Sequence, residues 1–125
     1  MRIKTTLYVL LLASLILNAA PTDLSGTWSF SVDLDDGGHG DPTFVLKQEG
    51  ANLTGTYSGP MGEQKVTGTV AGNHATFGFE LERDGEKSKA TYTAIIDSPT
   101  AMHGTIDFKS ASGNGASGKW TATKK

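Results

Sequence analysis

The chain has no cysteine among its 125 residues, so neither a disulfide nor a lipid on an N-terminal cysteine can stabilise or anchor it. It also has no excess of basic residues, because 11 Lys and Arg stand against 13 Asp and Glu. Binding to nucleic acid or to an anionic membrane surface depends on basic patches, and the clustered Lys87 and Lys89 have acidic residues beside them. We therefore expect no nucleic-acid partner and a fold that depends on packing alone.

The chain has one long apolar run, at its N-terminus. Arg2 and Lys4 precede an uncharged apolar segment, and small residues follow that segment. This order predicts a secretory signal peptide over residues 1–19, cleaved after Ala19, and a domain over residues 20–125. The run is shorter than the about 20 residues of a transmembrane helix, which disfavours the alternative of an uncleaved anchor. We expect an exported domain, periplasmic or extracellular, with no stable membrane insertion after cleavage.

Glycine is abundant, and one pattern with glycine at its centre occurs five times. The copies are Leu24-Ser25-Gly26-Thr27-Trp28, Leu53-Thr54-Gly55-Thr56-Tyr57, Val66-Thr67-Gly68-Thr69-Val70, Met102-His103-Gly104-Thr105-Ile106 and Ala116-Ser117-Gly118-Lys119-Trp120. At the two-residue period of a β-strand, the glycine shares a face with the two apolar residues. The hydroxyl, His and Lys side chains take the other face. The pattern is therefore a signature of fold and not of chemistry.

Alternation of apolar and polar residues continues through the domain and predicts strands rather than helices. The expected strands are Gly26 to Leu34, Thr43 to Gln48, Leu53 to Ser58, Gln64 to Ala71, Ala75 to Glu82, Lys87 to Ile96, Met102 to Lys109 and Ser117 to Thr123. Turn residues join most of them by short links, which favour antiparallel neighbours because a parallel crossover needs a dozen or more residues. We predict an all-β domain with about eight strands.

The aromatic residues after the signal segment all fall on the apolar face of their expected strand. They are Trp28, Phe30, Phe44, Tyr57, Phe77, Phe79, Tyr92, Phe108 and Trp120. The opposite face is rich in threonine, with Val45 and Ile95 as apolar exceptions. One apolar face on every strand fits a single antiparallel up-and-down β-barrel, with a β-sandwich as the alternative. Inward glycines favour the barrel, since they permit bends and leave room for aromatic rings from across the interior.

A barrel that spans a membrane would show the same alternation with its apolar face turned outward. Its strands would need about 9 to 11 residues, and several expected strands are shorter. We therefore expect the apolar face to line the interior.

Three segments resemble the opening strands of avidin and streptavidin. They are Leu24-Ser25-Gly26-Thr27-Trp28, Pro42-Thr43-Phe44-Val45-Leu46 and Gly50-Ala51-Asn52-Leu53-Thr54-Gly55-Thr56-Tyr57. The resemblance implies an eight-stranded up-and-down barrel of calycin or lipocalin-like type, in which Tyr57 matches the tyrosine that contacts the ureido oxygen of biotin. Phe30 replaces a polar residue of that pattern. This chain has two tryptophans, whereas several tryptophans line the biotin pocket of that family. We therefore do not expect biotin binding. The chain is also similar to a type of small bacterial secreted domain with repeated Leu-Thr-Gly-Thr segments.

No group of residues has the spacing typical of a catalytic or cofactor site. The segment from Asp33 to Asp41 holds carboxylates and glycines but lacks the spacing of a calcium loop. His39 falls at the opposite end of the expected barrel from His74 and His103, so we do not expect the histidines to share a zinc ion. No serine lies in a nucleophile elbow. We expect a protein that is not an enzyme and takes no cofactor or metal.

The interior of the barrel is the remaining candidate for a function. Eight strands enclose a lumen that is either filled by side chains or holds one small ligand. We predict a binding module for a small apolar or aromatic ligand, with its mouth at the end of the longer loops. The expected ligand-binding residues are Trp28, Tyr57, Phe79 and Trp120. The alternative is a protein-interaction domain with a packed core, such as a periplasmic inhibitor or envelope accessory protein, that binds an envelope protein through the loops around His39 and Met61.

Overall fold

The computed structural model describes residues 22–125, and the predicted signal peptide lies outside these residues. The described strands are β2 (Gly26–Leu34), β3 (His39–Gly40), β4 (Thr43–Glu49), β5 (Asn52–Gly59), β6 (Gly62–Ala71), β7 (His74–Arg83), β8 (Glu86–Ser98), β9 (Ala101–Ser110) and β10 (Gly115–Lys124). The long strands begin and end close to the predicted positions. The short β3 is an addition, in which the expected loop after β2 folds back onto that strand.

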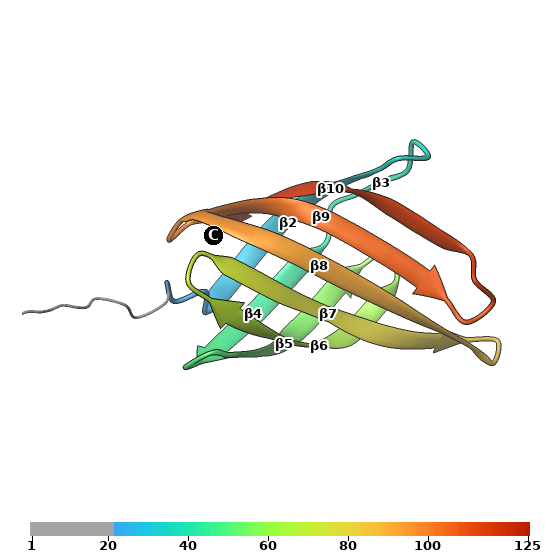
Figure 1. Cartoon of the computed structure of the whole chain (residues 1–125), viewed down its shortest axis with the longest axis horizontal. Helices are drawn as coiled ribbons and strands as arrows, with labels where there is room; N and C mark the ends of the chain where they lie inside the picture. Colours follow the sequence, from blue (N-terminus) through green and yellow to red (C-terminus); the bar gives the residue numbers. More distant parts are fainter. Residues whose placement is uncertain (1–21) are drawn as a thin grey trace, which may run out of the picture.

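The strands form one closed antiparallel barrel, in which each long strand pairs with its neighbours along the chain (Figure 1). The last strand returns to the first, with Trp120 of β10 opposite Val32 of β2 and Ala122 opposite Phe30. This pairing leaves no pair of separate sheets. The predicted up-and-down barrel of eight strands is therefore confirmed, and the sandwich alternative is excluded.

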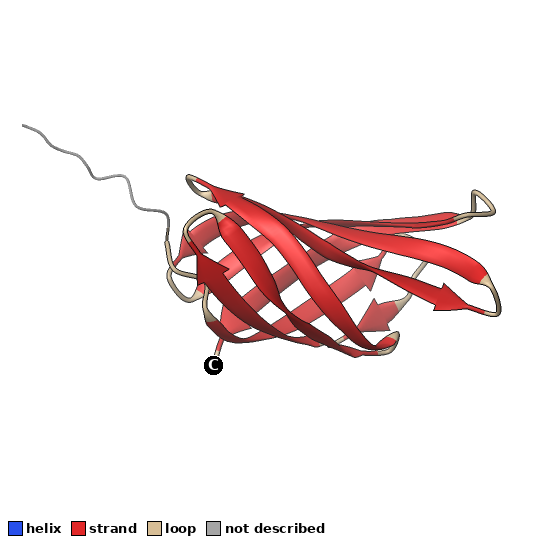
Figure 2. Ribbon diagram, turned by 90° about the horizontal axis from the view of Figure 1, so that it is seen from below, coloured by secondary structure: helices blue, strands red, loops and turns tan. Residues whose placement is uncertain are grey.

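The strands differ in length, and this makes one end of the barrel uneven. β8 has 13 residues, whereas β4 has 7 and β5 has 8. Figures 1 and 2 show the β7–β8 and β9–β10 hairpins extending well beyond the β5–β6 turn. We call this end, which also carries β3, the open end. The end formed by the turns at Gly50, Gly72 and Pro99 is the closed end.

Side chains alternate between the interior and the solvent as predicted. The inward aromatic residues are buried, except for the half-buried Phe108. Val45 and Ile95 are the exposed large apolar residues among those described, as the pattern indicated. Within residues 22–125 no helix has the length and apolar character needed to span a membrane.

The inward glycines allow close approach of neighbouring strands. A Cβ atom on Gly55 would collide with the carbonyl oxygen of Val45, and one on Gly104 would collide with that of Thr93. The structure therefore gives a reason for these glycines that the alternation of residues did not predict. At both positions the backbone of the adjacent strand occupies the space that a side chain would need.

Residues just before β2 fill the closed end of the barrel. Leu24 is completely buried, and its backbone N–H donates to Gln48 Oε1 at 2.8 Å. The indole Nε1 of Trp28 donates to the carbonyl oxygen of Leu24 at 2.9 Å. Above the same indole, Lys124 Nζ lies 5.5 Å from the ring centroid. The protein itself therefore covers this end and satisfies its buried polar groups.

Candidate functional site

Aromatic rings fill the middle of the barrel. The ring centroid of Phe30 lies 4.3 Å from that of Phe44 and 4.7 Å from that of Trp120. Phe77 and Tyr92 stack with centroids 5.6 Å apart and an interplanar angle of 5°. Ring pairs of this kind contribute about 0.5–1.5 kcal/mol each beyond the area that they bury. This layer of rings forms a packed floor across the lumen.

An apolar pocket of 330 Å³, which we call the mouth pocket, lies at the open end. Its apolar lining includes Val32, Leu34, Pro42, Ile106, Phe108 and Ala116. Pockets for small molecules typically measure about 300–1,000 Å³, so the mouth pocket is at the small end of that range. The polar side chains of the lining are those of Tyr57, Tyr92 and His39.

Tyr92 combines deep burial with a hydroxyl that has no partner. Its side chain is 1% exposed, and no hydrogen bond within residues 22–125 involves its Oη. Burial raises the pKa of this phenol, and the nearby Tyr57 raises it further, so it stays protonated. A buried hydroxyl without a partner costs about 1–3 kcal/mol of stability.

Tyr57 places a second hydroxyl beside the same pocket. The backbone N–H of Met61 donates to Tyr57 Oη at 3.4 Å, and burial raises the pKa of the phenol. A Cβ atom on Gly59 would lie 2.7 Å from this oxygen and 2.8 Å from Pro42 Cβ. Glycine at this position therefore allows the tyrosine to reach the β5–β6 turn.

Two segments meet over the mouth. The first is β3, where a Cβ atom on Gly40 would lie 3.3 Å from Pro60 Cγ. The second is the β5–β6 turn, where Gln64 Nε2 donates to the Met61 carbonyl oxygen at 2.8 Å. Met61 is half-buried, and methionine side chains adapt readily to different neighbours. The rim along this side is therefore built from small and adaptable side chains.

His39 holds β3 at the rim through two carboxylates. Its Nδ1 lies 2.8 Å from Asp33 Oδ1, and its Nε2 lies 2.9 Å from Asp41 Oδ1. The hydrogen bonds to Asp33 and then to Asp41 raise the pKa of the imidazole above its ordinary value. Only the protonated ring donates to both carboxylates at once.

The four sequence-predicted ligand-binding residues do not all lie together. Tyr57 lines the mouth pocket, and the ring of Phe79 lies 4.5 Å from that of Tyr57 by centroids. Trp120 stacks in the ring layer, where its Nε1 donates to the carbonyl oxygen of Thr105. Trp28 lies at the closed end. The role of these four residues in ligand binding stays a prediction.

Several residues of the mouth pocket were missed in the sequence. Tyr92 and Phe108 were placed on the inner face, and the sequence pattern offered no reason to prefer them over the other inward rings. His39 was considered only as a metal ligand or loop residue. The available signal was position along the strand: inward residues near the longer loops are the ones that border a mouth.

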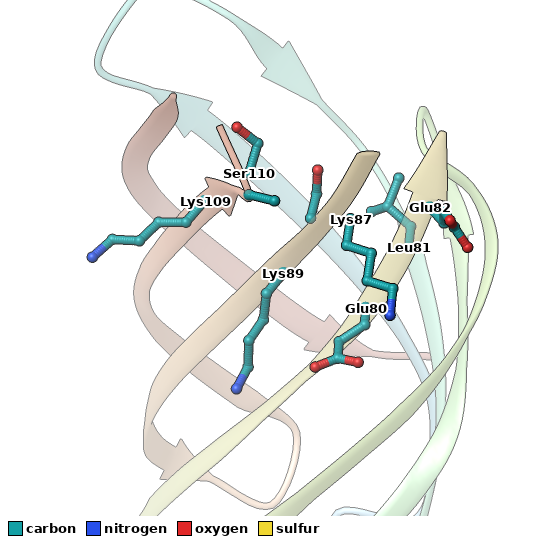
Figure 3. A pocket seen from close by; sticks show the side chains of 9 residues that line it. Glu80, Leu81, Glu82, Lys87, Lys89, Lys109 and Ser110 are labelled. Atoms are coloured by element: carbon teal, nitrogen blue, oxygen red, sulfur yellow. The ribbon is translucent and has the colours of Figure 1, made fainter. Parts of the chain in front are cut away.

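The charged side chains elsewhere do not converge on a site. A hollow of 450 Å³ lies across β7, β8 and β9 and is lined by Glu80, Lys89 and Lys109 among others. Figure 3 shows the amino groups of Lys89 and Lys109 extending in separate directions. Solvated charges of both signs on a curved outer face are typical of an ordinary barrel surface.

The described histidines are likewise dispersed. His39 lies at the open end, whereas His74 and His103 lie on β7 and β9 with β8 between them. His103 Nδ1 lies 2.7 Å from Asp97 Oδ2 on the exposed surface. Residues 22–125 contain no group of three His, Cys, Asp or Glu side chains arranged to hold a metal ion.

No protein-family model and no curated protein matches the chain. Solved structures do match it. EF1p2_mFAP2b, bound to DFHBI, is similar with a TM-score of 0.56 and 15% identity, over 82% of this chain and 93% of that chain. A fluorescence-activating β-barrel designed de novo is similar with a TM-score of 0.56 and 19% identity, over 87% of this chain and 100% of that chain. These likenesses show an eight-stranded antiparallel barrel and do not identify the chain as an avidin.

Proposed function

We propose that this chain is a binding module that takes a small apolar or aromatic molecule into the mouth pocket. The observation that carries the proposal is the change in packing along the barrel axis. Buried aromatic rings fill the middle of the barrel, and Leu24 and Trp28 fill the closed end. Leu34, Met61 and Phe108 at the open end are only half-buried. A ligand that covers these side chains gains about 25 cal/mol for each Å² of apolar surface removed from water.

The comparisons with solved structures support this kind of function for a barrel of this architecture. EF1p2_mFAP2b was solved with DFHBI, a small aromatic dye, in a barrel of the same architecture. An eight-stranded barrel has a lumen wide enough for one small ligand. The 15% identity transfers no contact residue, so the binding residues proposed for this chain rest on its own pocket.

We also propose that the module is not an enzyme and that it works outside the cytoplasm. In the mouth pocket, both ring nitrogens of His39 are engaged by Asp33 and Asp41, which leaves no lining imidazole available as a general base. Export rests on the signal-like pattern of residues 1–19.

The proposal is tested by filling the pocket with a side chain. Ala116 lines the mouth pocket from β10, so Ala116→Phe is expected to occupy the space of a ligand. Binding of small neutral aromatic probes would be measured by calorimetry on the purified protein, and the variant should weaken it at least about tenfold, the effect of losing about 1.4 kcal/mol of contacts.

A matched control is Ala71→Phe, the same change at an exposed position at the end of β6, away from the mouth pocket. It should leave the dissociation constant unchanged. Equal binding by Ala116→Phe and the wild type would place the ligand elsewhere and contradict the proposal. If the wild type binds none of the probes, the protein-interaction alternative, with the rim around His39 and Met61 as its contact surface, takes precedence.

A further inference from the structure

The buried polar groups of the lumen differ in one respect that bears on ligand chemistry. Trp28 Nε1 and Trp120 Nε1 both donate to backbone carbonyl oxygens, at 2.9 Å in each case. The Tyr92 hydroxyl has neither a donor nor an acceptor within residues 22–125, although its side chain is just as deeply buried. Buried polar side-chain groups normally have a partner, so this exception needs an explanation.

The environment of Tyr92 explains why the protein supplies no partner. Its ring lies among aromatic rings, with the Phe44 centroid at 5.1 Å, the Phe77 centroid at 5.6 Å and the Phe30 centroid at 5.9 Å. These neighbours have no hydrogen-bond acceptor. Tyr92 also lines the mouth pocket, so the pocket is the direction from which a partner can come.

Tyr57 adds a second donor on the same pocket. Its oxygen accepts a hydrogen bond from Met61 N–H, so its own proton remains to be donated. No hydrogen bond within residues 22–125 uses that proton. The other lining side chains are apolar or, for His39, already paired. The mouth pocket therefore offers two hydroxyl protons to a ligand, and its free side-chain acceptors are limited to the same two phenol oxygens and the Met61 thioether.

The charges around the mouth disfavour an anion. Asp33 and Asp41, on either side of His39, are largely exposed at the rim, and Asp35 and Asp36 lie in the same hairpin loop. No lysine or arginine lines the mouth pocket. A carboxylate that entered it would lose hydration without meeting an unpaired cation, because the His39 imidazole is already paired with Asp33 and Asp41, and this loss is costly.

We infer that the mouth pocket selects neutral aromatic molecules that carry a hydrogen-bond acceptor, such as a ketone, quinone or lactone oxygen, and that the Tyr92 hydroxyl donates to this acceptor. The inference rests on the proposed function, because it requires that a ligand occupies the mouth pocket. It goes further because it names the chemical class of the ligand and the residue that recognises it.

Three compounds with one ring system test the selection: 2-acetylnaphthalene, 2-ethylnaphthalene and 2-naphthoate. They share an apolar skeleton and differ in carrying a neutral acceptor, no acceptor or a charge. The ketone is expected to bind about three- to tenfold more tightly than the ethyl compound, the gain of one hydrogen bond. The carboxylate is expected to bind more than about a hundredfold more weakly than the ketone because it loses its hydration.

Tyr92→Phe keeps the ring and removes the hydroxyl. It should abolish the preference for the ketone over the ethyl compound and leave the affinity for the ethyl compound unchanged. The matched control is Thr93→Val, which removes a hydroxyl from the next residue of β8, on the exposed outer face, and should keep the preference. A preference that persists in Tyr92→Phe and disappears in Tyr57→Phe would overturn the assignment to Tyr92.

The two proposals fail in different ways. If the wild-type protein binds none of the three compounds, the proposed function itself is contradicted. If it binds all three with similar dissociation constants, and Ala116→Phe blocks that binding, the pocket is occupied as proposed and the inferred selectivity alone is wrong.

Discussion

The closed and open ends of the barrel differ in whether their buried polar groups have hydrogen-bond partners. At the closed end, Trp28 is completely buried and its Nε1 donates to the carbonyl oxygen of Leu24. At the open end, Tyr92 is almost as deeply buried but its hydroxyl has no partner among the described residues, and Phe108 is only half-buried. The comparison indicates that the closed end contributes more to the stability of the fold, whereas the open end gives up some stability by leaving a buried hydroxyl without a partner.

The largest expected effect is a difference in the free energy of unfolding when one aromatic ring is truncated at each end of the barrel. Trp28→Ala should lower the free energy of unfolding by about 3–5 kcal/mol, because it leaves a cavity and an unpaired Leu24 carbonyl. Phe108→Ala should cost only about 1–2 kcal/mol, because its ring is already half-exposed. Urea unfolding followed by circular dichroism measures both, and equal losses would show that the two ends contribute equally.

A smaller loss is expected where strands approach each other closely. Gly104→Ala should cost about 2–3 kcal/mol, because its Cβ atom would collide with the carbonyl oxygen of Thr93 and the sheet must shift. Gly72→Ala is the control: its Cβ atom would meet nothing within 4 Å, and its φ of +61° alone costs about 1 kcal/mol. Thermal and urea unfolding of the pair would test the close approach, which a similar loss in both variants would contradict.

A gain in stability is expected at the mouth pocket. Tyr92→Phe should raise the free energy of unfolding of the ligand-free protein by about 1 kcal/mol, because it removes a buried hydroxyl without a partner. Tyr57→Phe provides the contrast, since its hydroxyl accepts a hydrogen bond from Met61 and its loss should not stabilise the protein. Destabilisation by Tyr92→Phe would mean that the hydroxyl is already satisfied in solution.

The smallest effect concerns the rim and depends on pH. The carboxylates of Asp33 and Asp41 raise the pKa of His39 above 6.5, so protonated His39 is favoured in the folded state. The stabilisation is fully present below pH 6.5 and is lost as the pH rises through the raised pKa of the folded protein. The imidazole resonances of His39 in an NMR titration should follow this loss, and the amide-exchange protection factors of residues 38–41 should fall over the same pH range as the rim loosens.

His39→Gln should remove the pH dependence of the amide-exchange protection factors at the rim. His74→Gln, at an exposed histidine on β7, should leave it in place. If the protection factors of residues 38–41 are independent of pH in the wild type, the bridge through His39 does not hold β3.

Most of the fold followed from the period-two pattern, because which face a side chain occupies is a local property of a strand. Even the exceptions, Val45 and Ile95, were placed on the exposed face, where the structure has them. The close approach of backbone to the inward glycines was not predicted, since the atom that excludes a side chain at Gly104 belongs to a strand paired with it. Pairing register and bending are not visible within one strand.

The candidate site was only partly predictable, because a position on the inner face does not tell how far along the barrel axis a residue lies. Register decides that distance: Trp28 pairs with Lys124 and lies at the closed end, whereas Tyr92 pairs with Ile106, which lines the mouth pocket. Trp28 was predicted as a ligand contact on the inner face of its strand. Its place in the register puts it at the closed end, where its Nε1 donates to the Leu24 carbonyl oxygen, and its role in ligand binding stays a prediction.

The sequence by itself determined the strands and their inner and outer faces, because these depend on alternation and on short turns, and it favoured an antiparallel barrel, which the pairing of β10 with β2 then established. Only the tertiary structure decided which end is filled, which inward side chains border a pocket and which buried hydroxyl has no partner. Those properties depend on register, strand length and contacts between residues far apart in the chain. Tyr92 shows the division: its sequence context predicts an inward ring, and only its neighbours in space reveal a donor that faces the mouth pocket.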